Sequence, residues 1–338
     1  MYNKYNITVL GFFFLILLFP FLGIFNKINF DLEEISVFLD NSYTQRIVFF
    51  SFYQAFLSAI ISCILAIPFA LALNRHKDHK LVRYIISLCG FSFVIPSILI
   101  VFSVIKIFGY NGILNTYFNF YDLFSIKSIY GLKAILIAHV LLNTPFATRL
   151  FVQNLNTIPR NYYEISESIN LNFLGNIFKL EIPIIKQSLF AVFSIIFSLC
   201  FLSFAIVMAL GCSPKNSTLE VAIFQYALFD LNFNKAIILS FIQIFICITF
   251  VLIGFYNFKG SNFFEVGAIK FKHPHKNKKL IKYIDYFLIL FFIIVLFSPI
   301  FVIYNEFLKS IFLKANLTST FIHAFKNSIL ISLLTGII

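Results

Sequence analysis

The sequence predicts an all-α fold, a polytopic bundle of transmembrane helices. Hydrophobic residues make up 60% of the chain and charged residues 12%, whereas soluble domains contain about 25% charged residues. The mean hydropathy is +0.92. Apolar runs long enough to cross a hydrocarbon core of about 30 Å recur along the whole chain. Together these observations exclude a water-soluble protein of this length.

The apolar runs follow one another with polar connections between them. The runs long enough for a span lie at residues 7–25, 47–73, 84–108, 132–148, 188–211, 236–256 and 286–304. One more run opens near Phe325 and reaches Ile338. The first run has Lys4 as a weak positive flank, and no small-residue cleavage site follows it. We therefore expect a retained helix there rather than a signal peptide.

Basic residues gather in alternate connections. With a cytoplasmic N-terminus, the inner segments hold 16 of the 26 Lys and Arg but 6 of the 14 acidic residues; these segments are 1–6, 74–84, 149–187 and 257–285. This distribution is the positive-inside bias of multi-pass membrane proteins. Topology and contact with anionic membrane lipid therefore account for the net charge of +12, and we expect no nucleic-acid partner.

Several chemistries are disfavoured. A phosphate-binding loop needs closely spaced glycines before Lys and Ser or Thr, and none of the 12 glycines lies in such a run, so we expect no ATP hydrolysis by this chain. The five cysteines lack the spacing of a disulfide framework or metal cluster. His139, with Asn143 one turn later, lies inside a predicted span without an acidic partner. We expect a hydrogen-bonded histidine rather than a proton relay, and no catalytic residue, metal or cofactor.

Residues 159–183 form an amphipathic, charge-bearing insert between two apolar runs. Asn156 or Thr157 can cap a helix that starts at Pro159. Ile165 and Ile169 then share one face of this helix, while acidic and hydroxyl side chains keep the other face polar.

A second short helix is predicted from Asn172, which can cap it, to Pro183, which ends it. Two short helices joined by a bend form a compact knob on the basic side of the membrane. Amphipathicity alone favours an ordinary interfacial helix that lies among the lipid headgroups. The residue spacing indicates a different function.

The spacing resembles the cytoplasmic coupling motif of permeases of binding-protein-dependent ABC importers. That motif is written EAA, three residues, Gly, nine residues, Ile-x-Leu-Pro, and its counterparts here are Glu164, Ser166, Asn170, Leu180, Ile182 and Pro183. Ile165 and Ser166 replace the alanines, and Asn170 replaces the glycine. Because Asn tolerates a left-handed backbone better than other non-glycine residues, we expect the bend to persist.

The residues before the motif resemble the iron and thiamine branch of these permeases, with landmarks at Asn143, Pro145, Phe146, Arg149 and Pro159. The resemblance implies a type I importer (MetI-like) permease fold in the bacterial inner membrane and transport by alternating access. It implies that the loop 155–187 docks onto ATP-hydrolysing ABC subunits and that a periplasmic binding protein delivers the cargo. The coupling residues that it implies are Glu164, Ile165, Ser166, Glu167, Ser168, Ile169, Asn170, Leu171, Leu180, Ile182 and Pro183.

A second resemblance concerns the cargo. Residues 209–236 are similar to the periplasmic segment of thiamine transporter permeases, and the stretch QAFLSA at 54–59 points the same way. The matching positions are Gly211, Pro214, Thr218, Glu220, Gln225 and Asp230. We expect a short amphipathic helix over 217–230 at the outer surface, where a binding protein would dock. The resemblance favours thiamine or its phosphates as cargo, with ferric iron as the alternative.

The chain also echoes itself, since residues 287–307 are similar to residues 12–30. The thiamine and iron permeases are fused two-half proteins, so the resemblance implies a second permease half or copy as a partner. The alternative is a truncated remnant without transport activity. The predicted units are a first six-span half over 1–260, a basic cytoplasmic linker over 261–285 and the start of a second, incomplete half over 286–338.

Overall fold

A computed structural model describes residues 32–123, 128–256, 278–312 and 319–337, with scattered positions between 11 and 23. The span predicted over 7–25 lies largely outside the described residues. The linker predicted over 261–285 is described from residue 278 onward.

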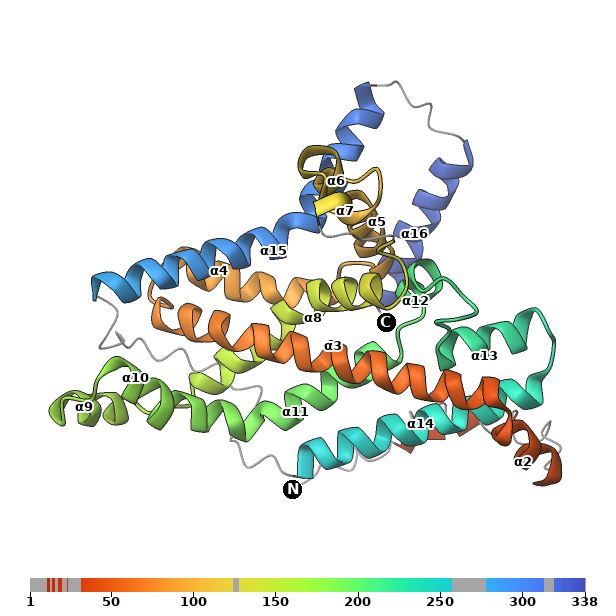
Figure 1. The fold of residues 1–338 in the computed structure, drawn as a ribbon, viewed down its shortest axis with the longest axis horizontal. Coiled ribbons are helices and arrows are strands. Elements are labelled where there is room, and N and C mark those ends of the chain that lie inside the picture. The colour runs from red at the N-terminus through yellow and green to blue at the C-terminus, as the bar shows by residue number, and fades with distance from the viewer. Residues whose placement is uncertain are drawn as a thin grey trace.

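The described elements are helices joined by short connections (Figure 1). In chain order they are α2 (Leu32–Asp40), α3 (Ser42–Arg75), α4 (Lys80–Leu88), η1 (Cys89–Phe93), α5 (Ser97–Phe108), α6 (Ile113–Phe118), α7 (Phe120–Leu123), α8 (Leu132–Leu155), α9 (Arg160–Ser168), α10 (Phe173–Asn176), η2 (Ile177–Glu181), α11 (Ile182–Phe201), α12 (Ala205–Leu210), α13 (Leu219–Leu228), α14 (Phe233–Tyr256), α15 (Lys279–Phe312) and α16 (Ser319–Ile337).

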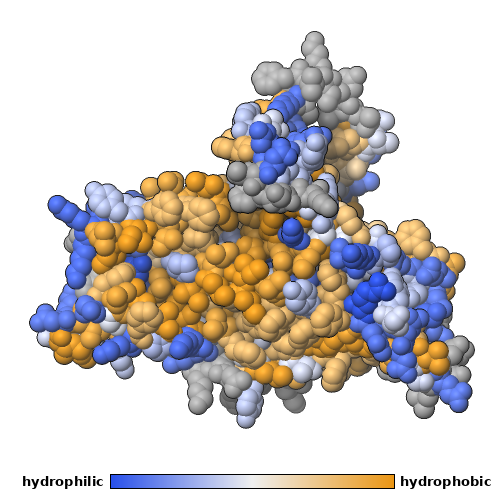
Figure 2. Space-filling view, viewed as in Figure 1, coloured by the Kyte–Doolittle hydropathy of each residue, from blue (hydrophilic) through white to orange (hydrophobic). Residues whose placement is uncertain are grey.

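Within the described residues, six helical segments are long and apolar enough to cross a membrane. They are Ser42–Arg75, Ser97–Phe118, Leu132–Leu155, Phe173–Phe201, Phe233–Tyr256 and Lys279–Lys309. Figure 2 shows hydrophobic side chains along the middle of the bundle and hydrophilic ones gathered towards its two ends. The predicted fold class, an all-α multi-pass membrane bundle, is confirmed.

Helix α3 forms the centre of the bundle and packs against α8 and α11. Small side chains on α3, among them Ala55, Ala59 and Ala66, are fully buried. Small residues let neighbouring backbones approach closely, which drives helix association where lipid supplies no hydrophobic force. The Gln54 side chain donates a hydrogen bond to the Cys200 carbonyl at 3.1 Å and so joins α3 to α11.

Two predicted spans are broken in the structure, which corrects the sequence-based expectation. The run 84–108 divides into α4, the short helix η1 and α5, with a gap at residues 94–96. The run 188–211 divides into α11 and α12, with a gap at residues 202–204. Pro96 explains the first break, because a residue before proline avoids the helical conformation.

The basic connections meet at one end of the bundle (Figure 1). The C-terminal ends of α3 and α8 lie there, together with α9, α10 and the N-terminal end of α15. The described parts of the basic segments 74–84, 149–187 and 257–285 therefore share this end, which is called the basic end below. Helices α2 and α13 lie at the opposite end.

Candidate functional site

The predicted knob projects from the basic end as α9 followed by α10 (Figure 1). Asn170 ends α9 with a φ of 51°, the left-handed conformation expected at this position. Its N–H donates to the Glu167 carbonyl, and the Leu171 N–H donates to the Ser166 carbonyl, both at 2.9 Å. This pair of bonds is a Schellman motif, which fixes the direction in which the chain leaves the helix.

The two faces of α9 have different surroundings. Tyr163 and Ser166 are 3% exposed and face the bundle. Tyr162, Ile165 and Ile169 are between 55% and 63% exposed. The predicted apolar face is therefore presented outward, and the helix is anchored through its tyrosine and serine instead.

The local caps differ in part from the prediction. Helix α8 continues to Leu155, so Asn156 caps its C-terminus and does not cap α9. Pro159 precedes α9, which begins one residue later than expected. Asn172 does cap α10, because its Oδ1 accepts a hydrogen bond from the Gly175 N–H at 2.7 Å.

Pro183 does not end the second short helix, which corrects another expectation. The chain runs from α10 through the π-helical turn η2 into α11, and Pro183 lies in the first turn of α11. Proline is tolerated there because its missing N–H would have no helical partner. The knob is therefore continuous with a membrane-spanning helix rather than separated from it.

A buried charged cluster holds the base of the knob. Arg75, at the end of α3, donates two hydrogen bonds to Asp285 of α15, from Nε at 2.9 Å and from Nη2 at 2.6 Å. Its Nη1 lies 3.8 Å from Glu181 Oε2 in η2. His76 Nε2 lies 3.1 Å from Asp285 Oδ2. The four side chains are at most 4% exposed, so the cluster joins three helical segments that are distant in sequence.

The cluster reaches the coupling helix through Tyr163, whose hydroxyl donates to Glu181 Oε1 at 3.4 Å. Burial raises the pKa of Tyr163 well above its usual range, and the nearby Glu181 acts in the same direction. Burial likewise lowers the pKa of Lys77, against the opposing charges of Asp78 and Glu181. Lys77 Nζ donates to Asn156 Oδ1 at 2.8 Å. The Tyr163 bond thus links α9 to the buried cluster.

The coupling residues implied by the sequence are brought together on this knob, mostly at its surface. Glu164 pairs with Arg160 at 2.6 Å, and both side chains are largely exposed. Ser166 is buried, and Leu171, Leu180 and Ile182 are half-buried. The exposed members of the set are Glu164, Ile165, Glu167, Ser168, Ile169, Asn170 and Pro183.

The landmarks upstream of the motif lie on α8. Asn143 Nδ2 donates to Cys200 Sγ at 3.2 Å and so ties α8 to α11. Pro145 is buried inside the helix. Arg149 packs so closely on η1 that a Cβ at Gly90 would overlap its guanidinium group. Absence of a side chain at Gly90 is what allows this contact.

The landmarks of the second resemblance gather at the opposite end of the bundle. Helix α13 covers the centre of the expected helix 217–230, and Thr218 precedes it. The Leu219 N–H donates to Ser51 Oγ at 2.8 Å, which fixes α13 on α3. Burial raises the pKa of Glu220, while Gln243 acts in the opposite direction. Gly211 and Thr218 are buried, Glu220 and Gln225 are half-buried, and Pro214 and Asp230 are exposed.

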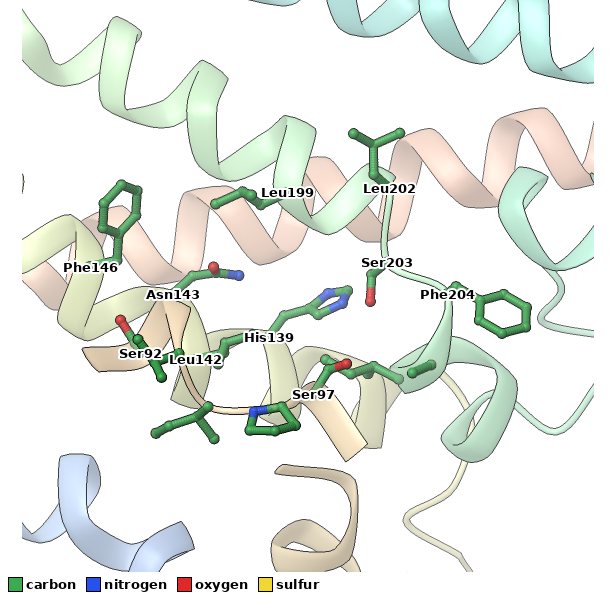
Figure 3. Close-up of a pocket in the computed structure, with 15 residues that line it drawn as sticks. Ser92, Ser97, His139, Leu142, Asn143, Phe146, Leu199, Leu202, Ser203 and Phe204 are labelled. Carbon is green, nitrogen blue, oxygen red and sulfur yellow. The ribbon is translucent and has the colours of Figure 1, made fainter. Parts of the chain in front are cut away.

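The two helix breaks line one pocket of about 510 Å³. Pro96 comes from the first break and Ser203 from the second, and His139 and Asn143 of α8 also line the pocket. Figure 3 shows the His139 imidazole extending towards the segment that carries Ser203. Irregular backbone at membrane depth is tolerated where it lines a cavity, so the two breaks and the pocket have one physical explanation.

His139 is hydrogen-bonded within the bundle, as expected. Its Nδ1 lies 3.0 Å from Ser58 Oγ of α3. Sequence reasoning did not identify Arg75, Asp285 or Glu181 as members of one site. Their signal is weak, because each is a charged residue near an apolar run, and charged residues in such places usually indicate only membrane topology.

Several known proteins are similar to this chain in sequence. It is 34% identical over 261 residues to the "Thiamine transport system permease protein ThiP" of Haemophilus influenzae, covering 77% of this chain and 48% of the relative. It is 35% identical over 214 residues to the proteins of the same name from Salmonella typhimurium and Escherichia coli, covering 63% of this chain and 40% of each relative. The chain thus spans about half the length of these relatives or less. No family model matches it.

Solved structures show the same fold. A bacterial ABC transporter involved in the import of the acidic polysaccharide alginate matches with a TM-score of 0.58 at 13% identity, covering 74% of this chain and 93% of the matched chain. A complex of a bacterial alginate ABC transporter with a pentasaccharide-bound periplasmic protein matches with a TM-score of 0.54 at 12% identity. The chain is therefore similar to the thiamine transport permeases over 77% of its own length and shares its fold with the ABC transporter of the solved structures.

Proposed function

We propose that this chain forms part of an importer that moves thiamine or a thiamine phosphate across the bacterial inner membrane by alternating access. The observation that carries the proposal is the knob at the basic end, an outward apolar helix face on a base fixed by buried ion pairs. The names of the sequence relatives support thiamine as cargo. The positive-inside bias supports a cytoplasmic location for the basic end.

The knob suits a separate ATP-hydrolysing ABC subunit as its partner. Tyr162, Ile165 and Ile169 are spaced three and four residues apart, so they form one apolar stripe on the surface of α9. An amphipathic helix that presents such anchors fits a hydrophobic groove. Because η2 leads directly into α11, a displacement of the knob moves a membrane-spanning helix.

The opposite end suits a periplasmic substrate-binding protein. Helix α13 and the turn after it present Leu228, Phe229 and Leu231, each at least 62% exposed, beside the exposed Asp230. Apolar residues bordered by polar ones are typical of a docking surface. The two partners would then contact opposite ends of the same bundle.

The ATPase contact is tested with the substitution Ile165→Asp. A carboxylate in an apolar groove is costly to desolvate, so we expect co-purification with the ABC subunit encoded nearest this gene to fall at least tenfold. Glu164→Lys should act in the same direction. Val37→Asp is the matched control, because Val37 is 72% exposed at the opposite end. Stoichiometric association of the Ile165 variant with the ATPase would contradict the proposed role of α9.

The cargo is tested by ATP-dependent uptake into vesicles that contain this chain together with its ABC subunit and its binding protein. We expect uptake of labelled thiamine to exceed uptake of ferric iron. The reverse ratio would favour the iron branch of the family. Uptake of neither would overturn a transport function for this assembly.

A further inference from the structure

One polar atom in the pocket remains without a partner. His139 is 1% exposed, and its Nε2 has no hydrogen bond, although Nδ1 is paired with Ser58. A buried polar group without a partner costs about 1–3 kcal/mol. In native structures such a group is usually completed by a protein atom, an ordered water or a bound molecule. The atom belongs to a residue that lines the pocket between the two helix breaks.

The chemistry of the pocket lining selects the class of molecule. The fifteen lining residues include no Lys, Arg, Asp or Glu. The lining combines Ser92, Ser97 and Ser203 with apolar side chains. Phosphate groups are usually held by cationic side chains or by helix N-termini, and ferric iron by anionic oxygen ligands. An uncharged lining that mixes hydroxyl, amide and imidazole groups with apolar side chains suits an aromatic heterocycle with hydrogen-bonding edges.

The imidazole can pair with either kind of ligand atom. Ser58 Oγ and His139 Nδ1 lie 3.0 Å apart, and the ring tautomer decides which of them donates. Nε2 is accordingly a donor to a ring nitrogen or an acceptor from an amino group. The edge of an aminopyrimidine carries both groups side by side.

We propose that this pocket is a transit site for the cargo and that Nε2 of His139 makes a hydrogen bond with the edge of an aromatic heterocycle. The proposal rests on the proposed function, since the aminopyrimidine ring of thiamine is such a heterocycle. His139 is then the residue that distinguishes the cargo from an analogue whose ring has no hydrogen-bonding edge.

The test measures binding to the permease without transport. Ser203→Cys places a thiol on the pocket wall, and Cys212→Ser removes an exposed native thiol. Thiamine should slow alkylation of Cys at position 203, and an analogue with benzene in place of aminopyrimidine should protect about tenfold less well. Ser128→Cys, on an exposed connection, is the control that thiamine should not protect.

The histidine is tested in the same background. His139→Leu should raise the thiamine concentration that halves alkylation about tenfold, the loss expected for one hydrogen bond. His139→Gln keeps a donor and should restore most of the protection, which separates hydrogen bonding from folding. Equal protection in the wild type and the Leu variant would overturn the proposal.

Failure of this proposal and failure of the proposed function give different results. Uptake of thiamine by the complete importer, with no protection at position 203, overturns the transit site and leaves the function standing. Protection without uptake supports the site and overturns transport. Neither protection nor uptake overturns both.

Discussion

The buried pair of Arg75 and Asp285 allows a prediction of how much stability the protein loses when one of the two charges is removed. Two charged groups that are at most 4% exposed lie 2.6 Å apart, and each loses its main counter-charge when the other is removed. Removing one partner of a buried ion pair costs about 3–5 kcal/mol, because the remaining charge is left uncompensated. Arg75→Met and Asp285→Leu should each therefore destabilise the protein by about that amount.

The double variant separates pairing from burial. Replacing both charges by apolar groups removes both desolvation costs, and such replacements are often close to neutral. Glu181 would lose its 3.8 Å contact with Arg75, so full recovery is not expected. The double variant should be more stable than the sum of the single effects predicts, by at least about 3 kcal/mol.

The assay is equilibrium unfolding in detergent micelles, carried out on the wild type, both single variants and the double variant. The exposed pair of Arg160 and Glu164 is the matched control, since it also has a 2.6 Å contact but side chains that are 62% and 49% exposed. Its coupling should not exceed about 0.5 kcal/mol. Additive effects at the buried pair, within about 0.5 kcal/mol, would refute the reasoning.

Two further predictions concern single residues. Asn170 has a φ of 51°, so Asn170→Val should destabilise the knob by about 1–2 kcal/mol while Asn170→Gly does not; a Val variant as stable as the Gly variant in thermal unfolding would contradict this. Burial raises the pKa of Glu220, so its contribution to stability is complete below the unfolded-state pKa and is lost as the pH rises through the folded-state pKa. Thermal unfolding from about pH 4 to about pH 7 should show this loss, and equal slopes in the wild type and Glu220→Gln would rule it out.

Much of the fold could be predicted because each helix that crosses a bilayer needs a long run of apolar residues in the sequence. The six described spans lie on or beside predicted runs. The two breaks were missed because hydropathy is insensitive to backbone conformation, and the gap at 202–204 contains no proline. Pro96 was an available signal for the other break.

The parts of the candidate site that depend on residues close together in the sequence could be predicted. Asn170 illustrates this, because a left-handed residue after a helix depends on a few neighbouring positions. The pairing of Arg75 with Asp285 could not be predicted, since the residues are 210 positions apart. Their contact follows from the packing of α15 against α3, which no local pattern specifies.

The two sites are connected by the same pair of helices. Helix α8 carries His139 towards its outer half and Asn154 near the knob, about 22 Å apart along a helix that rises 1.5 Å per residue. Asn154 Nδ2 donates to the Ile184 carbonyl at 2.6 Å and to Ser188 Oγ at 2.7 Å, which clamps α8 to α11 at the basic end.

A displacement of the knob therefore moves α8 and α11 as one unit. Their outer parts form walls of the pocket. The remaining walls come from the breaks at 94–96 and 202–204 and from residues beside them, and irregular backbone there can absorb changes in φ and ψ. We expect the pocket to change shape at these two breaks. A hydropathy pattern cannot show these two helix breaks. They are the positions at which motion from the basic end would reach a bound molecule.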